Sequence, residues 1–98
     1  MTRFEEMEAR WMFDELGFEL LKTSNPDYKD LIMYQRTTQQ HTQRITFDNK
    51  NKKFACACLD DTYVKKGFRM KNTPMHCDTK VFIAISRQIE ELGWLNEI

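Results

Sequence analysis

The chain has 98 residues, of which 41% are hydrophobic and 12% are aromatic. This composition supports a compact core and excludes a disordered chain, which would be poor in aromatic residues. Two separate cores would leave each half too short to bury enough apolar surface, so we expect a single domain over residues 1–98. Fifteen basic and fifteen acidic residues cancel, so the total charge does not attract the protein to nucleic acid or to an anionic membrane.

The first predicted element is a helix that begins near Thr2 and ends at Gly17. Thr2 and Glu5 form a capping-box pattern, in which the Thr hydroxyl and the Glu carboxylate accept backbone N–H groups of the first helical turn. Gly17 is predicted to end the helix in the left-handed conformation, with Phe18 folded back onto the last turn. The predicted apolar stripe contains Phe4, Met7 and Trp11, followed by Phe13 and Leu16.

Four segments that favour strands follow, at residues 18–23, 30–36, 43–48 and 53–59. Short polar connections join them, and NKNKK between the last two is typical of a hairpin without the usual glycine. An antiparallel meander is the expected topology. In the last segment both faces are apolar, which predicts a central or covered strand; one face has Phe54, Cys56 and Cys58, and the other has Ala55, Ala57 and Leu59.

The stretch from residue 60 to residue 77 has no predicted element, and long connections of this kind are often functional. A second helix is predicted after Asp78 or Thr79, and Gly93 ends it with Trp94 folded back. Its predicted stripe contains Val81, Phe82, Ile85, Ile89 and Leu92. The predicted fold is therefore α+β, with an N-terminal helix, a four-stranded antiparallel meander and a C-terminal helix. Both helices are expected on one face of the sheet.

Cys56, Cys58, His76 and Cys77 are the only clustered thiol and imidazole groups. Their spacing differs from the Cys-x2-4-Cys turns of zinc sites, so buried thiols are the favoured interpretation and disulfides are not expected. Adjacent His76 and Cys77 do not make a nucleophile and base. Three glycines exclude a glycine-rich phosphate loop. We therefore predict no catalytic residue, no metal, no cofactor and a non-enzymatic protein.

Positive charge is concentrated in the middle of the chain, where residues 31–71 have nine basic and three acidic side chains. Basic groups that alternate with aromatic rings can contact phosphates and stack on bases. The predicted binding site for a partner or nucleic acid consists of Lys50, Lys52, Lys53, Tyr63, Lys65, Lys66, Phe68, Arg69 and Lys71. A solvated basic face is the alternative, because nucleic-acid-binding domains usually have a clearly basic total.

No run approaches the ~18 apolar residues of a membrane span, and the N-terminus has no apolar signal core, so we expect a cytoplasmic protein that does not bind membranes. A homodimer is a further expectation, because one sheet face would stay uncovered. The apolar residues assigned to that face are Ile32, Tyr34, Ala55, Ala57 and Leu59.

The segment AISRQIEELGW, from Ala84 to Trp94, resembles the C-terminal helix A-I-x-x-Q-x-E-E-L-G-W of small uncharacterised phage and prophage proteins of Gram-positive bacteria. Glu15 to Glu19 is similar to their E-L-G-[YF]-E phrase, and Ile45 to Asp48 to their I-x-F-D strand. The resemblance implies a phage accessory protein that binds a host or phage protein complex in host takeover or anti-defence, for example as an anti-CRISPR inhibitor. A nucleic-acid-binding module is the alternative.

Overall fold

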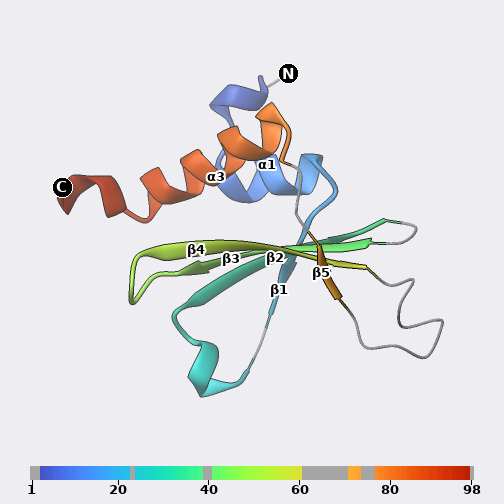
Figure 1. Ribbon diagram of the computed structural model, residues 1–98. Helices are drawn as coiled ribbons and strands as arrows, with labels where there is room; N and C mark the ends of the chain where they lie inside the picture. Colours follow the sequence, from blue (N-terminus) through green and yellow to red (C-terminus); the bar gives the residue numbers. More distant parts are fainter. Residues whose placement is uncertain (1–2, 23, 39–40, 61–70, 74–76, 98) are drawn as a thin grey trace. The chain divides into compact units, whose positions relative to one another are not determined.

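The computed structural model describes residues 3–22, 24–38, 41–60, 71–73 and 77–97. The chain divides into a helical unit, Met1–Phe18 with Cys77–Ile98, and a sheet unit, Glu19–His76. The predicted α+β class is confirmed. In chain order (Figure 1), the elements are η1 (Phe4–Glu6), α1 (Ala9–Glu15), β1 (Glu19–Leu21), η2 (Pro26–Tyr28), β2 (Leu31–Thr37), β3 (His41–Asp48), β4 (Lys53–Asp60), β5 (Lys71–Thr73), α3 (Thr79–Glu91) and η3 (Trp94–Glu97).

Gly17 ends α1 as the sequence predicts, in the left-handed region with φ of 90°. The N–H of Phe18 donates to the carbonyl of Phe13 at 2.9 Å, and the N–H of Gly17 donates to that of Asp14 at 3.0 Å. These two bonds define a Schellman motif. The rings of Phe13 and Phe18 pack edge to face with centroids 5.6 Å apart, which supplies the apolar contact that accompanies the motif.

The predicted ends of α3 are also confirmed. The side chain of Asp78 accepts the N–H of Val81 at 2.9 Å, so Asp78 is the N-cap. Gly93 follows the helix with φ of 75°, and its N–H donates to the carbonyl of Glu90 at 3.0 Å. Trp94, just past the glycine, is buried.

The start of α1 and its buried face differ from the prediction. The helix begins at Ala9, because Met7 and Glu8 have extended backbone that separates it from η1; Thr2 lies outside the described residues. Trp11, assigned to the stripe, is 53% exposed. The buried residues of α1 are Ala9, Met12 and Phe13. Of the residues assigned to the stripe, Phe13 is therefore buried in α1, whereas Trp11 faces solvent and Phe4 and Met7 lie outside the helix.

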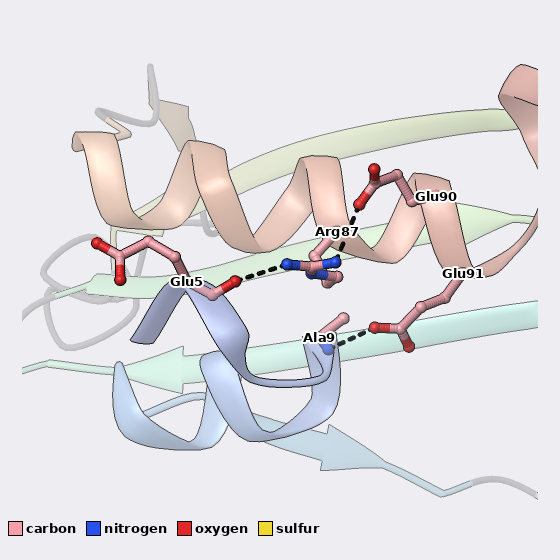
Figure 2. Close-up of polar contacts among 5 residues, drawn as sticks. All are labelled: Glu5, Ala9, Arg87, Glu90 and Glu91. Atoms are coloured by element: carbon pink, nitrogen blue, oxygen red, sulfur yellow. Dashed lines mark hydrogen bonds and ion pairs between the residues drawn. The ribbon is translucent and has the colours of Figure 1, made fainter. Parts of the chain in front are cut away.

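Two polar contacts hold the N-terminal segment against α3 (Figure 2). A carboxylate oxygen of Glu91 accepts the backbone N–H of Ala9 at 2.7 Å. The guanidinium of Arg87 donates to the carbonyl oxygen of Glu5 at 2.6 Å. Since Glu8 at the N-cap of α1 makes no capping bond with its side chain, Glu91 from the other end of the chain satisfies an N–H that the helix itself leaves open.

The sheet unit contains the four predicted strands and a fifth, in the order β1-β2-β3-β4-β5 with every described pair antiparallel. The fifth strand, β5, pairs with Cys58–Asp60 of β4 and was not predicted, because three polar residues have no strand pattern. The first half of β4 is exposed, whereas the sequence predicted a central or covered strand. Phe54 is 47% exposed, and Ala55 and Cys56 are also exposed.

The two faces of the sheet differ in burial. Residues directly opposite each other in the ladder share a face, so Tyr34, Ile45 and Cys56 lie together, as do Ile32, Phe47 and Phe54. Tyr34, Ile45 and Phe47 are buried on this core face, and the rings of Tyr34 and Phe47 pack edge to face at 6.3 Å. The placement of both helices over one sheet face, and the single domain, stay predictions.

Candidate interaction surfaces

Helix α3 has apolar side chains on two sides. Val81, Ala84, Ile85 and Gln88 are buried, whereas Phe82, assigned to the same stripe by the sequence analysis, is 65% exposed. Val81, Phe82 and Ile83 are consecutive and point in directions about 100° apart, so they cannot all face one core. One side of α3 therefore belongs to the core, and the opposite side is a surface.

The opposite side is hollowed into a depression of about 370 Å³. We call its lining the α3 surface, and it consists of Phe82, Ile83, Ser86, Arg87, Ile89, Glu90 and Leu95. Phe82, Ser86 and Ile89 follow one another at spacings of four and three, so they form a line along two helical turns. The small Ser86 lies between two larger apolar side chains, which explains the hollow.

The turn at Gly93 brings a further apolar residue to this surface. The left-handed glycine reverses the chain into η3, where Trp94 is buried and Leu95 is 56% exposed. Leu95 lines the same depression as Phe82. Burying a Phe or Leu side chain contributes roughly 1.5–3 kcal/mol, so these two exposed residues are the largest source of binding energy on the α3 surface.

The charged groups of the α3 surface are Arg87 and Glu90. Arg87 is fixed by its bond to the Glu5 carbonyl and by a 3.3 Å ion pair with Glu90 (Figure 2). The pair is largely exposed and neutral in sum, so it contributes little to stability. Glu90 uses one carboxylate oxygen for this pair, which leaves its other oxygen at the rim for a donor from outside.

The basic hairpin between β3 and β4 contains three residues of the predicted site. Lys50, Lys52 and Lys53 are all exposed there. The Asp48 carboxylate orders the loop by accepting the N–H groups of Lys50 at 3.1 Å and Asn51 at 3.2 Å, and the Asn51 side-chain amide at 2.7 Å. The bond from the Asn51 side chain, followed by the backbone bonds and the charge of Lys50, lowers the pKa of Asp48.

The structure does not bring the whole predicted site together. Lys71 pairs with Asp60 at one end of β4, and Lys53 lies at the other end. Seven residues at about 3.3 Å each separate the two ends by roughly 23 Å. The remaining predicted residues lie outside the described part of the chain, and they are Tyr63, Lys65, Lys66, Phe68 and Arg69.

The cysteines are thiols, as predicted. Cys58 is buried, but Cys56 and Cys77 are exposed, so the expectation of buried thiols holds for one of the three. His76 lies outside the described residues. Over the ranges that the structure describes, no group of three or more His, Cys, Asp and Glu side chains is arranged to hold a metal ion.

The α3 surface was not predicted from the sequence. A signal was present, because three consecutive apolar residues at 81–83 and a further apolar residue after Gly93 exceed what one stripe accommodates.

Among the described helices, none is long and apolar enough to cross a membrane. In comparisons with known proteins, no family model matches the chain, no curated protein sequence matches it, and no solved structure matches its fold.

Proposed function

We propose that this protein is a non-enzymatic binding module that acts by docking another protein on its α3 surface. The exposure of Phe82 and Leu95 around one depression is the observation that carries the proposal. Exposed apolar patches of this kind mark interaction sites, because leaving them in water favours association. The depression lies on a regular helix and its turn, so its shape exists before the partner arrives.

A small molecule fits the α3 surface poorly. Sites for small ligands enclose most of the ligand and place a few convergent polar groups around it. Here the apolar lining side chains Phe82 and Leu95 are more than half exposed, and the polar groups Arg87 and Glu90 are engaged with each other. A surface of this kind covers only one side of its ligand, which suits the surface of another protein.

A membrane surface fits it poorly as well. Helices that lie in the lipid interface have Lys and Arg along the border of the apolar face, where they meet anionic headgroups. The border of the α3 surface has Glu90 and an Arg87 that is already bonded to Glu5 and Glu90. The charge at this border is therefore neutral in sum, without the attraction that a lipid surface needs.

The expected partner element is an amphipathic helix. Phe82 to Ile89 spans about 10 Å along the axis of α3, which matches apolar side chains two turns apart on a second helix. Ser86 leaves room for a large apolar side chain between them. The carboxylate of Glu90 at the rim favours a Lys or Arg beside that apolar stripe.

The test uses a photo-reactive phenylalanine analogue placed at residue 82 or residue 95. The matched control places it at Trp11, which is an exposed aromatic residue on α1. We expect one protein to be cross-linked from both positions on the α3 surface and not from position 11. The purified partner should then bind the wild-type chain, and Phe82→Asp should weaken that binding at least about tenfold, the loss expected when a charge replaces a buried aromatic. Trp11→Ala should leave it unchanged.

Two results would contradict the proposal. Equal cross-linking from positions 11, 82 and 95 would show only random contacts. Unchanged affinity of a captured partner for the Phe82→Asp variant would place its site elsewhere. The biological setting that we propose, a phage accessory protein in host takeover or anti-defence, rests on the resemblance of Ala84–Trp94, Glu15–Glu19 and Ile45–Asp48.

Nucleic-acid binding by the basic hairpin is the second candidate function. Its support is that three exposed lysines, Lys50, Lys52 and Lys53, lie on one hairpin whose turn is ordered by Asp48. Phosphate contacts release counterions, so binding to single-stranded DNA or RNA should fall steeply with salt. Lys50→Glu with Lys53→Glu should abolish it, and Lys22→Glu with Lys29→Glu should not. Binding that is absent at low salt, or equal in both variants, would exclude this function.

A further inference from the structure

The segment that precedes α1 is attached to α3 without burying any of its side chains fully. It consists of η1 and of the residues around it, and the backbone of Met7 and Glu8 is extended. Phe4 and Met7 are half-buried, and the other residues of the segment are exposed, whereas Ala9 at the start of α1 is buried. We call residues 3–8 the N-terminal strap. Specific contacts, more than core packing, therefore hold the strap in place.

Two cationic side chains of α3 make these contacts. The ammonium nitrogen of Lys80 lies 5.7 Å from the centroid of the Phe4 ring, which is a cation–π distance. The guanidinium of Arg87 donates through Nη2 to the carbonyl oxygen of Glu5 at 2.6 Å (Figure 2). Lys80 and Arg87 are about two helical turns apart, so they lie on the same side of α3. Lys80 and Glu5 are exposed, and water and salt weaken charged contacts at such positions.

The strap can therefore open while α1 stays in place. Its opening breaks only the contacts that Lys80 and Arg87 make with it. The bond from the Ala9 N–H to the Glu91 carboxylate belongs to the start of α1 and is kept, as are the buried side chains of that helix. Segments with few buried contacts open locally, at a lower free energy than the unfolding of the whole protein.

Arg87 belongs both to the strap contacts and to the α3 surface. In the closed strap its Nη2 is used by Glu5, and its Nη1 donates to one carboxylate oxygen of Glu90 at 3.3 Å. Figure 2 shows the guanidinium between these two residues. Guanidinium and carboxylate groups prefer two parallel hydrogen bonds. When Glu5 leaves, Arg87 is free to bond both oxygens of Glu90.

We propose that the N-terminal strap is a regulatory device that controls the acidic group of the α3 surface. The closed strap holds Arg87 away from one oxygen of Glu90, and the open strap releases Arg87 to cover both. This inference rests on the proposed function, in which the free oxygen of Glu90 receives a Lys or Arg of the partner helix. The closed strap is therefore the form that binds the partner, and opening weakens binding.

A protease that cleaves after Glu measures the opening, because Glu5, Glu6 and Glu8 lie in the strap. Cleavage of a locally opened segment follows the population of the open form. Lys80→Ala and Arg87→Ala should each speed cleavage at these three sites at least about threefold, as mass spectrometry of the fragments would show. Arg87→Lys keeps a donor for the Glu5 carbonyl and should restore most of the resistance.

The matched control for cleavage is Glu90→Ala, on the next turn of α3. It removes the ion pair of Arg87 but keeps the bond to Glu5, so strap cleavage should stay at the wild-type rate. Cleavage that is unchanged in Lys80→Ala and Arg87→Ala, or that rises equally in Glu90→Ala, would overturn the inference.

Carboxyl labelling with a carbodiimide and glycine ethyl ester measures the second step, because paired carboxylate oxygens react more slowly. Phe4→Ala opens the strap and keeps both Arg87 and Glu90, so labelling of Glu90 should fall at least about twofold, while labelling of the exposed Glu15 on α1 stays constant. Adding Arg87→Ala should return Glu90 labelling to the wild-type level or above. Unchanged or increased Glu90 labelling in Phe4→Ala would overturn the inference.

Circular dichroism establishes that each variant is folded, and Lys80→Ala replaces Phe4→Ala in the labelling experiment if the latter does not fold. Both measurements use the chain alone. They are therefore independent of the cross-linking from positions 82 and 95, and a failure of the strap inference is distinguishable from a failure of the proposed function.

Discussion

Removal of the Glu91 carboxylate should destabilise the helical unit by an amount that the structure allows us to estimate. This carboxylate accepts the Ala9 N–H at 2.7 Å and is the side-chain cap of a seven-residue helix whose own N-cap residue, Glu8, makes no such bond. Loss of an N-terminal cap costs about 0.5–2 kcal/mol. Because Glu91 is exposed, screening by water favours the middle of that range, about 1 kcal/mol.

The variants should follow a clear order. Glu91→Ala loses both the acceptor and the negative charge near the positive end of α1, so its free energy of unfolding should fall by about 1 kcal/mol and its Tm by roughly 4–8 °C. Glu91→Gln keeps an acceptor oxygen and should lose about half as much. Glu90→Ala is the matched control on the same turn, and it removes only the exposed pair with Arg87, worth less than about 0.5 kcal/mol.

Urea and thermal denaturation followed by circular dichroism measure these differences. The Glu91→Ala effect should shrink at high salt, because the interaction of a charge with a helix end is screened. Equal losses for Glu90→Ala and Glu91→Ala, or a Glu91→Ala variant as stable as wild type, would refute the assignment of Glu91 as the cap.

Three further predictions concern turns and the hairpin. Lys52 has φ of 55°, so Lys52→Gly should relieve left-handed strain and raise the free energy of unfolding by about 0.5–1 kcal/mol. Lys50→Gly should lower the free energy of unfolding, and urea denaturation measures both changes. The pKa of Asp48 is lowered on folding, so its ionised carboxylate stabilises the folded state. This stabilisation is complete above the unfolded pKa of about 3.9 and is lost as the pH falls through the folded pKa. Asp48→Asn should therefore lower the urea midpoint at neutral pH. In an acid titration of the midpoint, the difference from wild type should shrink as the pH falls below the unfolded pKa of Asp48. Gly93→Ala places a Cβ 3.7 Å from the Asn96 side chain, without a clash, so any loss, about 1 kcal/mol by thermal denaturation, comes from the φ of 75° alone.

The sequence predicts best where a local rule applies. Gly17 and Gly93 were identified as helix ends, because a left-handed residue after a helix is nearly always glycine. The first four strands were located, because alternating side chains and turn residues bound them. Asp78 was identified as a cap for the same local reason.

The features that sequence alone did not predict depend on partners distant in the chain. The start of α1 at Ala9 is set with the help of Glu91, which no local pattern announces. The face on which Ile32 and Tyr34 lie follows from the pairing of Tyr34 with Ile45, and a shift of one residue would reverse it. In the predicted basic site, the pairing of Lys71 with Asp60 sets the distance between Lys71 and Lys53.

The contacts that join α1 and η1 to α3 link residues 82 positions apart in the chain. At about 5–20 residues per second, the ribosome needs roughly 4–16 s to synthesise that interval. A helix of seven residues is unstable alone, and Ala9 and Glu5 emerge from the ribosome well before Glu91 and Arg87, to which they bond. During this delay the sheet strands, which pair with their neighbours in sequence, can already assemble. The N-terminal segment is therefore the part of the nascent chain that chaperones and proteases can reach longest.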